Sequence, residues 1–217
     1  PNFPLFVTGS DDATVILYDL TTSPATVLAT IKCDSKIYCD WVLSVAFHPY
    51  LPFLAIGSSD GYVILYNISV LPPTRRHYFH NYSNYLNGVV FHPTLPCLAI
   101  CSLDTRVILY DISVLSSLSS TVPIIIKCQL QDHTNNIISV AFHGTLHLLA
   151  TGSCDSTVIL YDLTTSPPII KYHFKDHNGF IETLTVHPRL PLLSSGSLNS
   201  GLESTIIVYN LCNYFKM

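Results

Sequence analysis

Histidine, cysteine and aspartate are the side chains of this 217-residue sequence whose spacing most invites a chemical role, as metal ligands or acid–base groups. Two sets recur once per repeat: His48, His92, His143 and His187, and Asp12, Asp60, Asp104 and Asp155. Equivalent positions of a repeat are spread through a structure and do not converge. We therefore predict no metal site from the histidines and no catalytic carboxylate pair from the aspartates.

The remaining candidates give equally little sign of catalysis. The pairs His77 with His80 and His173 with His177 lack carboxylate or thiolate companions at ligand spacing. The seven cysteines form no Cys-x-x-Cys pair, which indicates free thiols in a reducing compartment. No nucleophile elbow, phosphate loop or His-Glu-x-x-His occurs. The sequence predicts no catalytic residue, no metal and no cofactor.

Composition narrows the class of partner. Charged residues make up 11% of the chain, the net charge is −4, and mean hydropathy is +0.40. The absence of a basic patch argues against nucleic acid. Two apolar stretches, 41–59 and 85–103, approach the length of a membrane span, but each has two prolines near its middle. We predict a strand, a turn and a strand in each stretch, no membrane partner, and a cytoplasmic location because no secretory leader is visible.

An internal repeat organises the sequence. Each copy has a His-Pro-like turn, a Leu-Ala-Ile-Gly-Ser-like run, an Asp turn and a Val-Ile-Leu-Tyr-like run. The last run ends at Tyr18, Tyr66, Tyr110, Tyr161 and Tyr209, spaced 44 to 51 residues apart. Short runs rich in β-branched residues and bounded by Gly, Asp and Pro predict strands. A fourth strand is predicted in each connector, over 25–32, 75–79, 124–130 and 169–174, and no helical periodicity is present.

These motifs resemble the WD40 family of β-propellers, with Tyr-Asp or Tyr-Asn in place of the family's Trp-Asp. The resemblance implies an all-β fold, a β-propeller of four-stranded antiparallel blades. It covers residues 1–217 as one partial propeller domain. We predict repeat units of 1–20, 21–68, 69–112, 113–163 and 164–211. Because the first unit begins after its first strand, we expect an N-terminally truncated part of a larger ring of about seven blades, although a closed ring of five stays an alternative.

The resemblance also implies a hydrogen-bonded chain inside each blade, made of a histidine, a Ser or Thr, the turn aspartate and the aromatic residue. A full set is present only in the fourth unit, as His133, Thr151, Asp155 and Tyr161. Tyr38 and Tyr82 stand where two units would have the histidine, and Glu203 stands at the aspartate position of the fifth unit. Without the histidine, we expect Asp60 and Asp104 to lie in wetter turns.

Partners of the family often bind the loop face that precedes the first strand of each blade. The residues seven before the recurring histidines are Trp41, Tyr85, Asn136 and Phe180, and Leu103 precedes a turn aspartate on the same face. Aromatic side chains anchor interfaces well, so we predict these five as a partner-binding surface. The alternative is that they form the buried start of each first strand.

The sequence thus predicts a non-enzymatic scaffold that binds a protein or peptide and acts as a subunit of a complex. Two alternatives stay open. One is a propeller enzyme or ligand-binding domain that uses the central channel, because a fold alone does not exclude activity. The other is a structural subunit of a large assembly.

Overall fold

The computed structural model of the chain describes residues 4–32, 41–82, 84–116, 123–199 and 204–214. Tyr38, Glu203, Cys33 and Cys39 lie outside these residues. Eighteen strands form five antiparallel sheets, and two short 3-10 helices, η1 (Ser113–Ser116) and η2 (Leu211–Tyr214), are the helical elements of the described chain. None of its helices has the length and apolar character needed to cross a membrane.

The first two sheets cover the N-terminal part of the chain. The first sheet contains β1 (Leu5–Gly9), β2 (Thr14–Asp19) and β3 (Thr26–Lys32). The second contains β4 (Val42–Phe47), β5 (Phe53–Ser58), β6 (Tyr62–Asn67) and β7 (Thr74–His80).

The other three sheets follow in chain order. The third sheet contains β8 (Leu86–Phe91), β9 (Cys97–Ser102), β10 (Val107–Asp111) and β11 (Ile125–Leu130). The fourth contains β12 (Ile137–His143), β13 (Leu148–Ser153), β14 (Val158–Asp162) and β15 (Ile169–Phe174). The fifth contains β16 (Phe180–Val186), β17 (Leu192–Leu198) and β18 (Ser204–Asn210).

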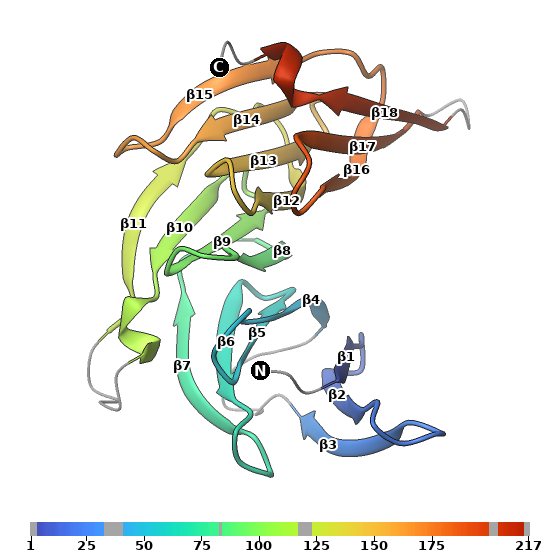
Figure 1. Cartoon of the computed structure of the whole chain (residues 1–217), viewed down its shortest axis with the longest axis vertical. Helices are drawn as coiled ribbons and strands as arrows, with labels where there is room; N and C mark the ends of the chain where they lie inside the picture. The colour runs from blue at the N-terminus through green and yellow to red at the C-terminus, as the bar shows by residue number, and fades with distance from the viewer. Residues whose placement is uncertain (1–3, 33–40, 83, 117–122, 200–203, 215–217) are drawn as a thin grey trace.

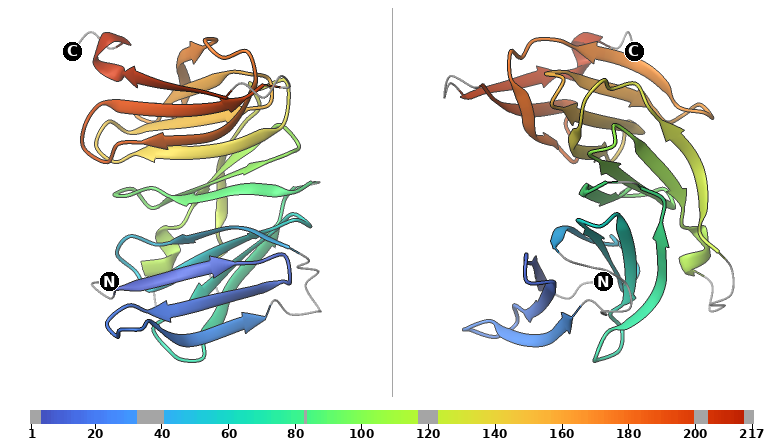
Figure 2. Two further views of the ribbon diagram at one scale, coloured as in Figure 1. Left: turned by 90° about the vertical axis from the view of Figure 1, so that its right-hand side faces the viewer. Right: turned by 180° about the vertical axis from the view of Figure 1, so that it is seen from behind.

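The sheets fan out one after another in an arc, as Figure 1 shows, with the first and last sheets at its two ends. The inner strands β4, β8, β12 and β16 lie next to one another along the arc. Strands of successive sheets are stacked across the molecule (Figure 2). This arrangement confirms the prediction of an all-β fold of radially arranged antiparallel sheets. The second, third and fourth sheets have the predicted four strands, and the first and fifth have three among the described residues. Each predicted repeat unit after the first begins with the outer strand of one sheet and ends with the third strand of the next.

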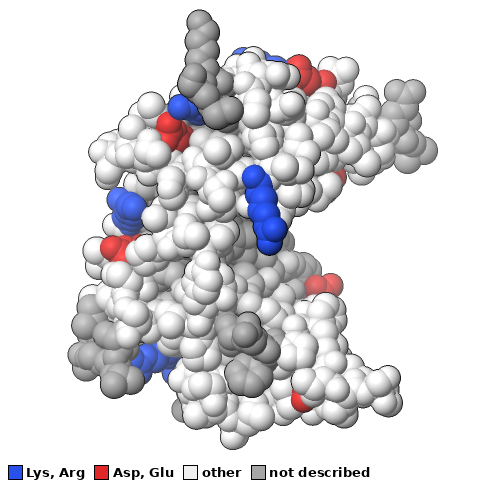
Figure 3. Space-filling view, in the orientation of Figure 1, with Lys and Arg blue, Asp and Glu red and all other residues white. Residues whose placement is uncertain are grey.

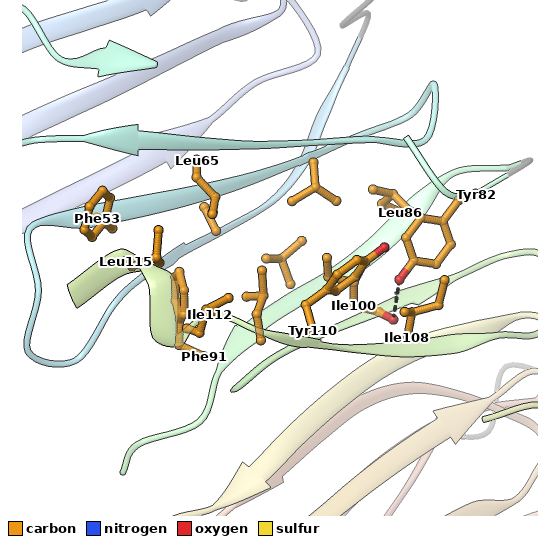
Figure 4. Close-up of a cluster of buried hydrophobic side chains, with 14 residues drawn as sticks. Phe53, Leu65, Tyr82, Leu86, Phe91, Ile100, Ile108, Tyr110, Ile112 and Leu115 are labelled. Carbon is orange, nitrogen blue, oxygen red and sulfur yellow. Dashed lines mark hydrogen bonds between the residues drawn. The ribbon is translucent and has the colours of Figure 1, made fainter. Parts of the chain in front are cut away.

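Apolar side chains from neighbouring sheets form the core between them. Figure 4 shows one such junction, where Phe53 and Leu65 of the second sheet face Leu86, Ile100 and other residues of the third. Runs such as Val-Ile-Leu-Tyr are apolar on both faces because a sheet inside the arc is covered on both sides. β9 and β13 are accordingly buried along their whole length.

The outward faces at the two ends of the arc carry apolar side chains that are exposed. Phe6 is 52% exposed, whereas its counterpart Leu98 in the third sheet is fully buried. Ile206 and Val208 on β18 are 78% and 64% exposed, and the equivalent positions in the other four sheets are buried. These two end faces have the composition of a junction between sheets.

Candidate functional site

Four sequence-predicted residues lie at the start of successive inner strands. Trp41, Tyr85 and Asn136 directly precede β4, β8 and β12, and Phe180 is the first residue of β16. Each pairs with a residue at the end of the neighbouring second strand. The carbonyl oxygens of Trp41, Tyr85 and Asn136 accept the amides of Ser59, Leu103 and Cys154 at 2.9, 3.0 and 2.8 Å, and Phe180 pairs with Leu198. We call these eight residues the loop rim.

The large side chains of the loop rim are open to solvent. Trp41, Tyr85, Phe180 and Leu198 are 45%, 42%, 51% and 45% exposed. Asn136 and Leu103 are half-buried. The aromatic residues therefore do not form the buried start of each first strand, which was the alternative interpretation of the pattern.

Two aromatic residues of the loop rim touch across a junction between sheets. The rings of Trp41 and Tyr85 lie edge to face, with centroids 6.1 Å apart. This arrangement is favourable for aromatic pairs and restrains both side chains before any partner arrives. The second and third sheets thus present one continuous aromatic surface.

Phe180 and Leu198 line a pocket on the rim of the fifth sheet. The pocket has a volume of about 240 Å³, and Ser156, Asn178, Gly179 and Asn199 complete its lining. It is wide enough for a single large side chain. Sequence reasoning missed Leu198 because the turn after it differs in length from the other copies. The residue that follows each Gly-Ser pair would have identified it as the counterpart of Leu103.

Below the rim of the fourth sheet, His133 forms hydrogen bonds with a residue of β13 and with the turn between β13 and β14. Its Nδ1 lies 2.8 Å from Asp155 Oδ2, and its Nε2 lies 2.8 Å from Thr151 Oγ1. The amide of Thr134 and the amide and hydroxyl of Thr157 also donate to the Asp155 carboxylate. Burial opposes ionisation of Asp155, but the hydrogen bonds from His133 and Thr157 outweigh it and hold its pKa well below the usual range.

Tyr161, the fourth residue of the predicted hydrogen-bonded set, bonds to a residue outside that set. Its hydroxyl donates to Asp132 Oδ2 at 3.1 Å, and the ring is almost fully buried. Asp132 is the residue beside His133, so Tyr161 and Asp155 both hold the segment that leads into β12. Asp132, Asp155, His173 and His177 also line a polar hollow of about 370 Å³, which shares Ser156 with the pocket of Phe180.

The third sheet replaces the missing histidine by a different set of contacts. Tyr82 is buried, and its hydroxyl donates to the carbonyl of Ile100 at 3.1 Å (Figure 4). Arg106 lies over the Tyr82 ring and forms an ion pair with Asp104. The expectation of a wetter turn at Asp104 is wrong, because its side chain is 9% exposed and Arg106 supplies the compensating charge.

The second and fifth sheets differ again. Asp60 accepts the Ser58 hydroxyl, while its second oxygen is buried without a hydrogen bond from the described residues. Because this oxygen is buried, the expected wetter turn is absent here as well. In the fifth sheet, His177 contacts Ser195 Oγ at 2.6 Å and Thr205 Oγ1 at 3.2 Å.

The four recurring histidines, three of them followed by Pro and His143 followed by Gly144, fix the backbone of their turns. In each one, Nδ1 accepts the amides two and three residues later, at 2.8 to 3.2 Å. This bonding requires a neutral ring with its proton on Nε2. Burial lowers the pKa of His48 and of His92 to about 4, which keeps both neutral.

The described part of the chain has no arranged site for a metal ion, and two of its thiols are deeply buried. No group of three or more His, Cys, Asp or Glu side chains there could hold a metal ion. Cys97 and Cys101 are buried, and burial raises the pKa of each thiol to about 12. Such thiols are inert at neutral pH.

Comparison with known proteins places the chain in a family. The model of "WD domain, G-beta repeat" matches residues 28–67, 73–111 and 125–162, which together make up more than half of the chain. The chain belongs to the WD40 repeat family. Members of this family generally act as scaffolds for protein interactions and not as enzymes.

A solved structure gives independent support for the fold. A chain from "Crystal Structure of Mitotic Checkpoint Complex" is similar to this WD40 chain with a TM-score of 0.75 and 18% sequence identity. The similarity covers 93% of this chain and 56% of that chain. At this identity the similarity shows the fold alone. No curated protein matches the sequence.

Proposed function

We propose that this WD40 chain is a non-enzymatic scaffold that binds a protein partner through its loop rim. The observation that carries the proposal is the exposure of Trp41, Tyr85 and Phe180 at equivalent positions, together with that of Leu198, the strand partner of Phe180. Large apolar side chains gathered at one end of a rigid fold are typical of interaction sites. The partner would be a peptide or a neighbouring subunit.

The chemistry of the rim favours an apolar or aromatic partner segment. Trp41 and Tyr85 offer a pre-ordered aromatic surface, and the Phe180 pocket accepts a side chain. Ser156, in the turn held by Asp155 and His133, forms one wall of this pocket. Because the hydrogen-bonded chain fixes that turn before binding, less conformational entropy is lost on association.

The small number of charged surface residues supports a subunit that is covered by other proteins. The free thiols support a reducing compartment. Lys, Arg, Asp and Glu side chains are few and scattered on the face seen in Figure 3. A free surface normally carries more of them. All five described cysteines are free thiols, which supports a cytoplasmic location. The absence of a basic patch supports a protein partner over nucleic acid.

A structural subunit of a larger assembly is the second candidate, and the outer strands favour it. Ile125 and Ile126 on β11 are 57% and 49% exposed, and Ile169 and Ile170 on β15 are 52% and 45% exposed. Contacts along the outer edge of the arc would cover these side chains in addition to the loop rim.

Affinity capture with mass spectrometry tests the proposal. The double variant Trp41→Ala, Phe180→Ala is compared with the wild type and with Tyr50→Ala, Tyr78→Ala, whose side chains are 66% and 55% exposed away from the rim. We expect the partners to be lost only from the rim variant, by tenfold or about 1.4 kcal/mol at least. Equal recovery by all three proteins would contradict binding at the loop rim.

A further inference from the structure

A hollow lies between the fourth and fifth sheets, at the end of the strands opposite the loop rim. It has a volume of about 420 Å³. Leu146 and Leu148 form its wall on the fourth sheet, and Pro191 and Cys212 form its wall on the fifth. We call it the inter-sheet groove. Its turns lie at the end of the molecule that also carries η2 (Figure 2, left).

Of the two cations that line the groove, Lys171 forms a salt bridge with a described carboxylate and Arg189 does not. Lys171 Nζ lies 3.0 Å from Asp162 Oδ2, so these two charges offset each other. Hydrogen bonds from Thr164 lower the pKa of Asp162 to about 2, and this carboxylate is therefore ionised at neutral pH. Arg189 also lines the groove. Among the described residues, no carboxylate forms a salt bridge with its guanidinium.

Comparison with another junction shows that this cation is particular to the groove. A hollow of about 340 Å³ lies at the equivalent place between the second and third sheets. There Thr94 stands at the position of Arg189, and Ser113 stands at that of Cys212. Positions that recur in every copy serve the architecture. A charged residue in one copy alone indicates a function of that copy.

We propose that the inter-sheet groove binds a partner peptide in which a bulky aliphatic residue stands next to an acidic one. The aliphatic side chain lies against Leu146 and Leu148, and the carboxylate accepts hydrogen bonds from Arg189. A groove of this volume accommodates one or two side chains. Guanidinium–carboxylate pairing supplies the orientation.

The surroundings of the groove favour a peptide over a free small acid. Leu190, beside Arg189, is 52% exposed, and Leu146 is 37% exposed. Apolar surface thus continues beyond the groove and would contact further residues of a bound chain. This site lies away from the loop rim, so its occupation does not depend on the proposed function.

Cys212 provides the test, because its thiol is exposed and lines the groove. The probe is an end-blocked hexapeptide, Gly-Ser-Leu-Asp-Ser-Gly, and the comparison peptide has Lys in place of Asp. Alkylation of Cys212 by iodoacetamide is followed by mass spectrometry. Buried Cys101 reports on whether the protein stays folded. At millimolar concentration the Leu-Asp peptide should slow alkylation about threefold, and the Leu-Lys peptide should not.

Two variants complete the experiment. Arg189→Thr reproduces the residue found at the equivalent junction and should abolish the protection. Lys127→Thr removes an exposed cation from β11 and should leave the protection unchanged. Equal protection by both peptides, full protection in Arg189→Thr, or no protection at all would overturn the proposal. Protection by decanoate without protection by the Leu-Asp peptide would overturn it in favour of a small amphipathic acid.

Discussion

Asp155 and Asp12 occupy the same turn position in two sheets, but their surroundings differ. Asp155 accepts hydrogen bonds from His133, Thr134 and Thr157, and its side chain is 10% exposed. Asp12 is exposed and bonds only to neighbours in its own turn. The same residue type at the same position therefore contributes differently to stability.

Replacement of these aspartates measures that difference. Asp155→Ala should lower the free energy of unfolding by about 3 kcal/mol, because it leaves His133 and two amides without their shared acceptor. Asp12→Ala should change the unfolding midpoint in urea much less. Equal losses for the two variants would show that the His133 contacts do not stabilise the fourth sheet.

His48 and His92 should make stability depend on pH in a defined window. Burial lowers the pKa of each to about 4, whereas an unfolded histidine titrates near 6.5. Below pH 6.5 the unfolded state binds more protons than the folded state, so stability falls as the pH decreases toward 4. The slope should approach 1.4 kcal/mol per pH unit for each histidine.

The variant His92→Asn isolates one of these contributions. Its side-chain oxygen can accept the amides of Thr94 and Leu95, but it does not titrate. Urea unfolding between pH 4 and 7 should show a shallower dependence than in the wild type. An unchanged slope would mean that His92 is not held neutral by burial.

At the residue scale, the sequence predicted where the turn and hydrogen-bonding residues lie better than it predicted which side chains contact them. It located the aspartate turns and the residues of the His133 chain. The role of Arg106 was not predictable, because an arginine two residues beyond an aspartate is usually solvated, and its contact with Tyr82 depends on the fold. That Trp41, Tyr85, Asn136, Phe180 and Leu103 bind a partner stays a prediction.

At the scale of the element, close approach between sheets explains the recurring Gly-Ser pair. A Cβ on Gly57 would lie 2.6 Å from Val89 of the next inner strand, and one on Gly152 would lie 2.5 Å from Ile181. The third sheet has Cys101 at this position. Its strand partner is Gly88, where the second, fourth and fifth sheets have Ser or Thr. A Cβ on Gly88 would lie 2.7 Å from the Cys101 sulfur.

Because the small residue lies on β8 and the larger one on β9 in this sheet, and not in the second, fourth or fifth, we expect substitutions at Gly88 and Cys101 to affect stability in a strongly non-additive way. Gly88→Ser alone should cost about 2 kcal/mol of stability because the added atoms crowd Cys101 and Val140. The double variant Gly88→Ser, Cys101→Gly recreates the pair formed by Ser44 and Gly57 and should recover most of that loss. Additive losses in urea unfolding would contradict the compensation.

Most elements were predictable from the sequence. The connector strands over 75–79, 124–130 and 169–174 match β7, β11 and β15 within one residue at each end. Isoleucines mark the last two, and the aromatic pair Tyr78-Phe79 marks the first. The apolar stretches 41–59 and 85–103 form two strands each, as predicted. The 3-10 helices η1 and η2 were missed, since four residues are too short to show a helical period.

At the scale of the whole molecule, the radial stacking of the sheets places equivalent residues of successive sheets on one surface. The inner strands run side by side, so residues at their starts gather on one rim even though 44 residues of sequence separate Trp41 from Tyr85. The exposed apolar faces of β1 and β18 match the composition of the buried junctions. A larger ring of about seven blades, in which such faces would be covered, stays a prediction.

Site-specific photo-cross-linking tests the central claim most directly, because it reports contact at a chosen residue. A photoreactive phenylalanine analogue is placed at Phe180 or, as the matched control, at Tyr50, which is exposed at the opposite end of the strands. After irradiation in cells, the account predicts a discrete cross-linked partner band from position 180 and none from position 50. Cross-links of equal yield at both positions, or at position 50 alone, would contradict partner binding at the loop rim.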